Sequence, residues 1–151
     1  MDKSNIATAK GLDLPISTKA SIEVCNFIKH KSLQRAKRYL DLVLEKKAAI
    51  PLTQYNQNRG HRVGKMGPGF FPQKTTKEII RILNSAEANA KNKGLNVEIL
   101  IIKNIIVNKA SRPMKTGRIR GQKKRSHIEI FLCEKEAKIV KKIKKESKGK
   151  E

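Results

Sequence analysis

Two apolar runs enclose a strongly basic segment in residues 97–133, and this pattern limits what the region can form. Residues 97–107 and 128–132 are rich in Ile, Leu and Val, a composition typical of strands. The intervening residues 111–125 hold seven Lys or Arg and no Asp or Glu. We predict an antiparallel β-hairpin whose ends belong to a core and whose middle has too little apolar surface to fold alone. Its charge indicates that a polyanion orders it.

The whole chain is basic, and its positive charge is concentrated in irregular segments. The formal charge is +22, from 35 Lys and Arg against 13 Asp and Glu. No acid lies between Glu45 and Glu78, or between Glu98 and Glu129. A nucleic-acid partner is the usual explanation for such an excess.

Other classes of protein find little support. The apolar runs are far shorter than the roughly 20 residues of a spanning helix, so no membrane insertion is expected. Residues 1–5 lack a signal-peptide core, so the chain is expected to stay in the cytosol or nucleus. Cys25 and Cys133 are the only cysteines and are expected in the core, while the histidines are scattered, so neither a metal nor another cofactor is expected. The loops lack paired carboxylates and nucleophile motifs, which argues against an enzyme.

Three amphipathic helices are predicted before residue 97, from apolar residues at i, i+3, i+4 and i+7 spacing. The second begins after the cap Ser32 and is stopped by Pro51. The third begins at a capping box of Thr75 and Glu78 and ends at Gly94. A basic stripe on the second helix is either a solvated face or a phosphate contact; it comprises Lys31, Arg35 and Arg38.

Residues 51–74 form a long loop with four glycines, three prolines and no acid. Residues 60–65 resemble a phosphate-binding loop, but three rather than four residues separate the glycines and Met66 replaces the hydroxyl residue, so nucleotide binding is not expected. Contact with nucleic acid is expected instead, because glycines let backbone N–H groups approach phosphates. Its basic candidates are Arg59, Arg62 and Lys65. Three aromatic side chains are candidates for base stacking: Tyr55, Phe70 and Phe71. For Phe70 and Phe71 the alternative is packing in the core.

These elements predict an α+β fold in which three helices pack on a small antiparallel sheet and a long basic β-hairpin protrudes. We divide the chain into an extended N-terminal segment (1–15), one α+β RNA-binding domain (16–136) and a Lys-rich tail (137–151). The domain includes the loop 51–74 and the hairpin 97–133.

Several segments, taken in order, resemble one protein family. They are residues 84–90 (NSAEANA), 107–110 (VNKA), 117–119 (GRI) and 124–128 (KRSHI). Over residues 16–136 the chain is similar to the large-subunit ribosomal proteins called L-twenty-two in bacteria and L-seventeen in eukaryotes. Residues 59–60 and 71–72 resemble the eukaryotic branch.

This resemblance implies a structural constituent of the large subunit that binds rRNA, stabilises subunit folding and lines the nascent-peptide exit tunnel. To the basic candidates of the second helix and the loop it adds rRNA-facing hairpin stems: Lys109, Arg120, Lys123, Lys124, Arg125 and His127. Spacing on a strand would place Arg118, Arg120 and Lys124 on one face and Lys123 and Arg125 on the other. The tunnel-facing tip would comprise Arg112, Pro113, Met114, Lys115, Thr116, Gly117 and Arg118.

The implied partners are large-subunit rRNA, neighbouring ribosomal proteins near the tunnel exit and, transiently, the nascent polypeptide, with no homo-oligomer. The implied location is the cytoplasmic ribosome, with passage through the nucleus and nucleolus for assembly in a eukaryote. Sixteen residues separate Ala110 from His127, fewer than the family usually has, which leaves open whether the tip reaches the tunnel constriction. On the residues alone, the alternative is a general nucleic-acid packaging protein, which would bind duplex DNA as well as structured RNA.

Overall fold

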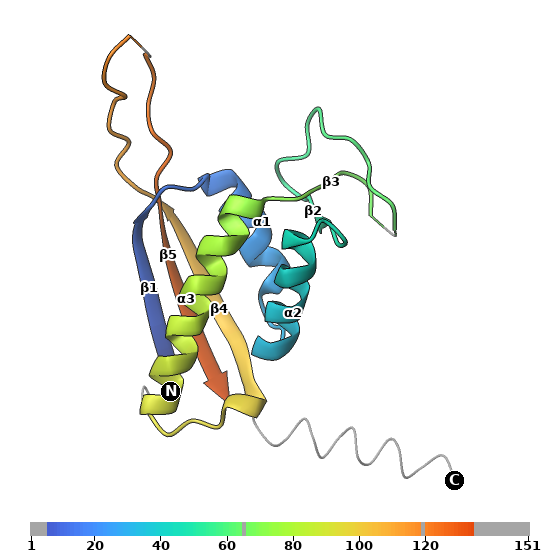
Figure 1. Cartoon of the computed structure of the whole chain (residues 1–151). Coiled ribbons are helices and arrows are strands. Elements are labelled where there is room, and N and C mark those ends of the chain that lie inside the picture. The colour runs from blue at the N-terminus through green and yellow to red at the C-terminus, as the bar shows by residue number, and fades with distance from the viewer. Residues whose placement is uncertain (1–5, 65, 119, 135–151) are drawn as a thin grey trace.

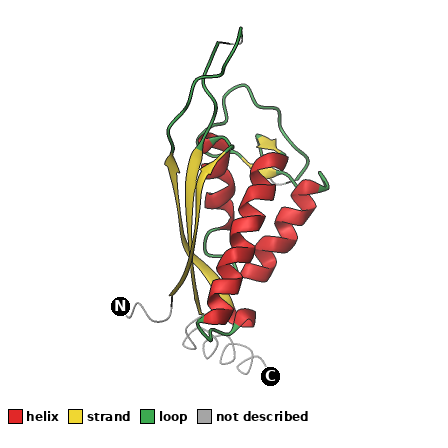
Figure 2. Ribbon diagram, turned by 60° about the vertical axis from the view of Figure 1, so that its left-hand side comes forward, coloured by secondary structure: helices red, strands yellow, loops and turns green. Residues whose placement is uncertain are grey.

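A three-stranded antiparallel sheet carries the helices on one face (Figure 1, Figure 2). The computed structural model describes residues 6–134 except 65 and 119. The strands lie in the order β1 (Ile6–Leu14), β5 (Ser126–Glu134), β4 (Leu100–Lys109). The helices are α1 (Thr18–Ile28), α2 (Leu33–Leu44) and α3 (Gln73–Asn92). The predicted α+β architecture, with three helices on a small antiparallel sheet, is confirmed.

Strand β1 comes from the segment for which the sequence predicts only an extended chain. It pairs with β5 from Ile6 opposite Cys133 to Leu14 opposite Ser126, with an irregularity between Gly11 and Leu14. Residues 6–14 therefore contribute an edge strand, and β5 becomes the central strand of the sheet. The Lys-rich tail of residues 137–151 lies outside the described residues.

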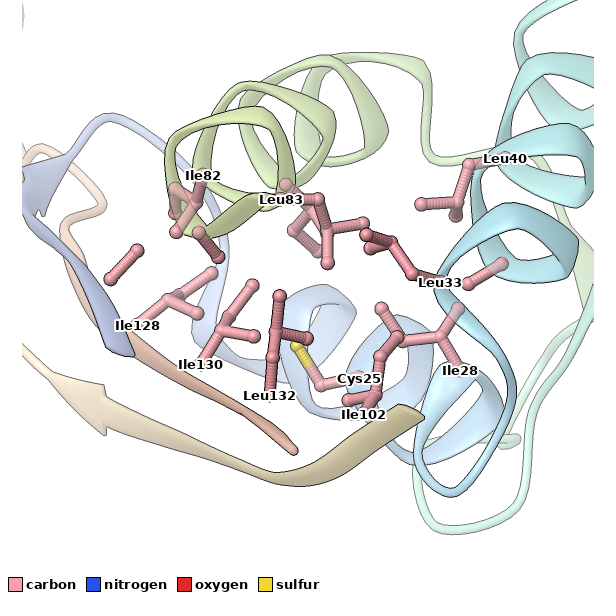
Figure 3. Close-up of a cluster of buried hydrophobic side chains, with 14 of the residues drawn as sticks. Cys25, Ile28, Leu33, Leu40, Ile82, Leu83, Ile102, Ile128, Ile130 and Leu132 are labelled. Carbon is pink, nitrogen blue, oxygen red and sulfur yellow. The ribbon is translucent and has the colours of Figure 1, made fainter. Parts of the chain in front are cut away.

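The core lies between the sheet and the helices (Figure 3). Strand β5 buries every second residue, and Ile128, Ile130 and Leu132 face the helices. The apolar stripe predicted for the third helix is fully buried on α3; it comprises Ile79, Leu83, Ala86 and Ala90. Cys25 of α1 is also buried, whereas Cys133 is half-buried. The period of two on β5 and of 3.6 on α3 is what brings these side chains to one interface.

The predicted end of α3 is confirmed, but its predicted start is wrong. Gly94 follows the helix with φ +73°, and its N–H donates to the carbonyl of Lys91. The helix begins at Gln73, directly after Pro72, so Thr75 lies buried in the first turn and cannot cap it. Glu78 pairs with Arg81 instead. The carbonyl of Pro72 accepts from the N–H of Thr76, so the first turn closes ahead of the capping-box pattern.

Helix α2 also departs from expectation, because it ends at Leu44 rather than near Pro51. Lys46 has φ +61°, a left-handed conformation that terminates the helix. The chain then forms β2 (Ile50–Pro51), which pairs with β3 (Gly69–Phe70) at the two ends of the long loop.

Strands β4 and β5 are adjacent and antiparallel, and their connection extends beyond the sheet (Figure 1). A 3₁₀ turn at Val97–Ile99 precedes β4, so the strand begins later than its apolar run. We call residues 110–125 the connection. Its described residues lie outside regular strand, so the predicted alternation of charges between two strand faces is wrong for them. The backbone N–H of Lys115 donates to the carbonyl of Gly121, and that of Lys123 donates to the carbonyl of Pro113. These bonds hold the two sides of the connection together locally.

Candidate nucleic-acid interface

One end of the molecule gathers most of the predicted contact segments. Strand β4 ends and β5 begins there, so the connection leaves the sheet at this end, and the loop between β2 and β3 extends from the same end (Figure 1, Figure 2). Helices α1 and α3 both begin there. We call this region, made of the connection, the loop 52–68 and the first turns of α1 and α3, the basic end.

The two helix N-termini add to the positive potential of the basic end. Neither first turn contains an acid, and the side chain of the α1 N-cap Ser17 makes no capping hydrogen bond. The N-terminus of a helix carries a partial positive charge and unpaired N–H groups that favour anions. Both helix ends therefore add their partial positive charge to that of the nearby lysines and arginines.

A groove of about 520 Å³ lies between the connection and the starts of α1 and α3; we call it the α3 groove. Its lining includes five basic side chains and, among its described residues, no acid. The basic residues are Lys74, Lys115, Lys123, Lys124 and Arg125. A surface of this kind can receive a phosphate backbone, because several cations face one concave space.

A second groove, of about 510 Å³, lies on the other side of Lys124 and is lined mainly by α1 and the loop; we call it the Tyr55 groove. Lys124 lines both grooves. Arg59 and Tyr55 from the loop and Lys19 from α1 also line the Tyr55 groove. The structure thus brings the predicted loop residue Arg59 together with the predicted hairpin residue Lys124.

The loop is held in place by Glu23, a buried acid of α1 that the sequence pattern does not reveal. Its Oε2 accepts from the backbone N–H and hydroxyl of Thr53, at 3.0 and 2.9 Å. Its Oε1 accepts from the backbone N–H of Gln54 and of Tyr55, at 2.8 and 2.9 Å. Burial alone would raise the pKa of this carboxyl, but the four donors outweigh burial and the pKa lies below its ordinary value of 4.5.

Arg62 folds back on its own loop. Its Nε donates to the carbonyl of Gly69 at 3.4 Å, and its guanidinium carbon lies 5.2 Å from the centre of the Phe71 ring. A Cβ on Gly69 would come within 2.9 Å of Arg62 Cγ, so a side chain at position 69 would displace the arginine. Phe71 is therefore covered by a cation, whereas Arg59 stays exposed. Lys65 lies outside the described residues.

Two predicted stem residues, Arg125 and His127, hold the end of β1. A guanidinium nitrogen of Arg125 donates to the carbonyl of Asp13 at 2.9 Å, and the Asp13 N–H donates to Nδ1 of His127 at 3.1 Å. Asp13 has φ +49° and lies within the irregular stretch of β1. Both side chains are half-buried, whereas Lys109 and the connection residues Arg120, Lys123 and Lys124 are exposed.

The basic stripe of α2 lies away from the basic end. Ser32, just before α2, bridges to Ile101 at the beginning of β4, which is the opposite end of that strand from the connection. Arg35 and Arg38 are exposed there. Lys31 instead packs over the ring of Phe27, and burial, with the nearby Arg35, lowers its pKa. The structure does not bring this stripe together with the hairpin residues.

The predicted tip, residues 112–118, is largely exposed. Only Arg112 is half-buried, and its Nε is enclosed without a hydrogen-bond partner among the described residues. Met114, which bridges to Gln122, is 62% exposed, and Gly117 has φ +81° in the turn. An exposed apolar side chain and an unpaired donor are suited to contact with another molecule.

The described part of the chain offers neither a membrane span nor a metal site. No described helix is long and apolar enough to span a bilayer. Within the same residues, no three His, Cys, Asp or Glu side chains group in a way that could hold a metal ion.

Comparison with known proteins identifies a matching family and several relatives. The family model described as "Ribosomal protein L22p/L17e" matches residues 9–134. The large ribosomal subunit protein uL22 of Methanococcus vannielii is 38% identical over 88% of this chain and 92% of that protein. The protein of the same name from Nanoarchaeum equitans is 38% identical over 86% of this chain and 79% of that protein. The Archaeoglobus fulgidus uL22 protein is 40% identical over 67% of this chain and 66% of its own length.

These matches agree with the expectation that the chain is a structural component and not an enzyme. The three relatives are archaeal, so the assignment to the eukaryotic branch stays a prediction. The resemblance seen in the sequence is confirmed: the chain belongs to the ribosomal protein family L22p/L17e.

Proposed function

We propose that this protein is a structural constituent of the large ribosomal subunit and binds large-subunit rRNA through the basic end. The observation that carries the proposal is the gathering of exposed cations from separate segments around two adjoining grooves that have no acid among their described lining residues. Family membership supplies the identity of the nucleic acid, because the relatives are named as proteins of the large ribosomal subunit.

The mechanism is neutralisation of phosphate charge. RNA segments that repel each other can approach when cations lie between them, and each neutralised phosphate releases counterions. The connection extends away from the sheet, so RNA can contact it on more than one side (Figure 1). The two helix N-termini and the loop then bind RNA at the base of the connection. The protein thereby stabilises the folded subunit.

We divide most of the proposed contact residues into three groups by their exposure and contacts. Arg59, Lys109, Arg120, Lys123 and Lys124 are exposed and form the direct contacts. Arg125 and His127 act chiefly by positioning the base of the connection, through Asp13. Arg35 and Arg38 belong to a second surface on α2, suited to a different RNA segment or to a neighbouring large-subunit protein.

We further propose that the tip, residues 112–118, lines the nascent-peptide exit tunnel. The tip is exposed and lies far from the core, and both features support this role (Figure 2). RNA can enclose one side of the connection while the tip faces the tunnel. Partners would then include the nascent polypeptide and ribosomal proteins near the tunnel exit. The protein would work in cytoplasmic ribosomes, with assembly in the nucleolus if the cell is eukaryotic.

The test measures binding to purified large-subunit rRNA as a function of salt. Lys124→Ala should lower affinity and reduce the log–log salt slope by about 0.7 to 0.9 for each phosphate that is no longer neutralised. The matched control is Lys91→Ala, which also removes one cation but lies in the last turn of α3, paired with Glu87. It should leave the slope unchanged.

Equal slopes for the two variants would remove Lys124 from the interface. Equal affinity of the wild-type protein for rRNA and for duplex DNA of the same length would favour general nucleic-acid packaging over a ribosomal role.

A further inference from the structure

We propose that the Tyr55 groove binds a single unpaired nucleotide of the rRNA, with its base stacked on Tyr55. This inference rests on the proposed function and specifies one contact within it. The groove lies between α1, the loop, β3 and the connection, and its volume of about 510 Å³ falls in the range of small-ligand sites. It is lined by aromatic, amide and cationic side chains, the three kinds that contact a nucleotide.

An apolar surface for the base is already in place. Tyr55 and Phe70 line the groove and are half-buried, and Leu52 lies buried beside them. Phe70 also packs against the hydrophobic core, which fixes the floor of the groove. The backbone N–H of Tyr55 is bound to Glu23, so its position is set before RNA binds. Unstacked RNA bases are commonly held on aromatic side chains of this kind.

The loop also supplies groups that can recognise the edge of a base. Gln54, Gln57 and Asn58 line the groove and are exposed. Each side-chain amide has both donors and an acceptor, so the three together can form hydrogen bonds with a Watson–Crick edge. A paired base presents no such edge, which favours an unpaired nucleotide over a duplex.

Three cations surround the groove and come from three separate segments. They are Lys19 of α1, Arg59 of the loop and Lys124 of the connection, and none of the described lining residues is acidic. Lys19 Nζ lies 5.3 Å from the centre of the Tyr55 ring. An exposed cation–π contact is weaker than base stacking, so a base can displace the ammonium, which then remains near the phosphate.

Phe71 is not equivalent to Tyr55, although it lies in the same loop. The guanidinium of Arg62 already covers its ring, and Phe71 does not line the groove. The structure therefore selects Tyr55 among the three aromatic candidates for stacking, with Phe70 as the floor.

Tyrosine fluorescence gives a direct test, because the chain has two tyrosines and no tryptophan. Tyr39 packs on Phe27 and donates to the carbonyl of Ala49, so Tyr39→Phe leaves Tyr55 as the only emitter. The full chain carrying this change, checked for native circular dichroism, is titrated at low salt with single-stranded hexaadenylate. A blunt RNA duplex with the same number of phosphates is the comparison. Stacking predicts strong quenching by the single strand and little by the duplex.

Affinity for large-subunit rRNA provides the second readout. Tyr55→Ala should weaken binding about 5- to 150-fold, the range expected when one base no longer stacks, with no change in salt slope. Tyr55→Phe should bind like the wild type. Unchanged affinity of Tyr55→Ala, or equal quenching by single strand and duplex, would overturn the nucleotide site. Failure of the wild-type protein to bind rRNA would instead overturn the proposed function.

Discussion

The guanidinium of Arg125 donates to the backbone carbonyl of Asp13, across more than 100 residues of sequence. This bond joins the last residue of the connection, just before the central strand β5, to the end of the edge strand β1. Its geometry changes the expected role of Arg125, because a side chain committed to the protein backbone has less freedom to follow a phosphate. A basic residue predicted to contact RNA can thus act chiefly by stabilising the protein.

Replacing Arg125 should affect stability more than replacing Lys124. Arg125→Ala loses a hydrogen bond from a charged donor and should reduce the free energy of unfolding by about 1 kcal/mol. Lys124→Ala changes an exposed side chain and should stay within about 0.5 kcal/mol of the wild type. Urea unfolding of the two variants checks this order. Equal stabilities would mean that the bond to Asp13 contributes nothing measurable.

Glu23 should make the attachment of the loop dependent on pH. Its pKa is lowered in the folded protein, so its contribution to stability is complete above its ordinary value of 4.5 and is lost as the pH falls through the folded pKa. Glu23→Gln keeps the shape but loses the charge, and should cost about 2 kcal/mol near neutral pH. The stability difference between wild type and variant should shrink as the pH falls from neutrality to below the ordinary carboxyl pKa of 4.5. A difference that stays constant over this interval would exclude the carboxylate as its source.

Cys25 should report on opening of the core. Burial raises the pKa of its thiol to about 12, so at mildly alkaline pH the native protein holds it as an unreactive thiol. In a Cys133→Ala background, a thiol reagent should label Cys25 only when the chain unfolds, and the labelling rate should rise with urea. Rapid labelling in the native state would show that α1 separates from the sheet without global unfolding.

The connection should be the least protected described segment of the free protein. The described residues of 111–124 are mostly exposed, and few of their N–H groups have backbone partners. Strands β4 and β5, by contrast, form a continuous ladder apart from one irregularity. Amide exchange should be fast there without RNA and should slow when rRNA is bound. Strong protection in the free protein would contradict the view that RNA orders this segment.

Much of the fold follows from hydrophobic periodicity, and the exceptions have physical causes. Strand β1 escapes prediction because its inward positions Ala7, Ala9 and Gly11 are small, and its large Leu12 is exposed. Small residues are needed there because α3 passes close: a Cβ on Gly11 would lie 2.6 Å from Ile82 Cδ1. A search for alternating large apolar residues does not find a strand whose inward positions are Ala and Gly.

The segments of the proposed interface can be predicted from the amino-acid composition, but the roles of individual residues in it cannot. Charge identifies the connection and the loop, because acids are missing from both. It does not separate Lys124, which faces the grooves, from Arg125 one residue later, which also binds Asp13. Nor does it reveal Glu23, an acid among the apolar residues of α1 whose four donors come from residues 53–55. These roles depend on contacts between distant segments.

The central claim, that this protein is an integral part of the large ribosomal subunit, is tested most directly by sedimentation. A lysate of the source cell is fractionated on a sucrose gradient, with and without a high-salt wash, and the protein is followed by immunoblot. An integral protein should migrate with free large subunits, monosomes and polysomes and should stay with them after the wash. Recovery in light or chromatin fractions, or release by salt, would contradict that claim.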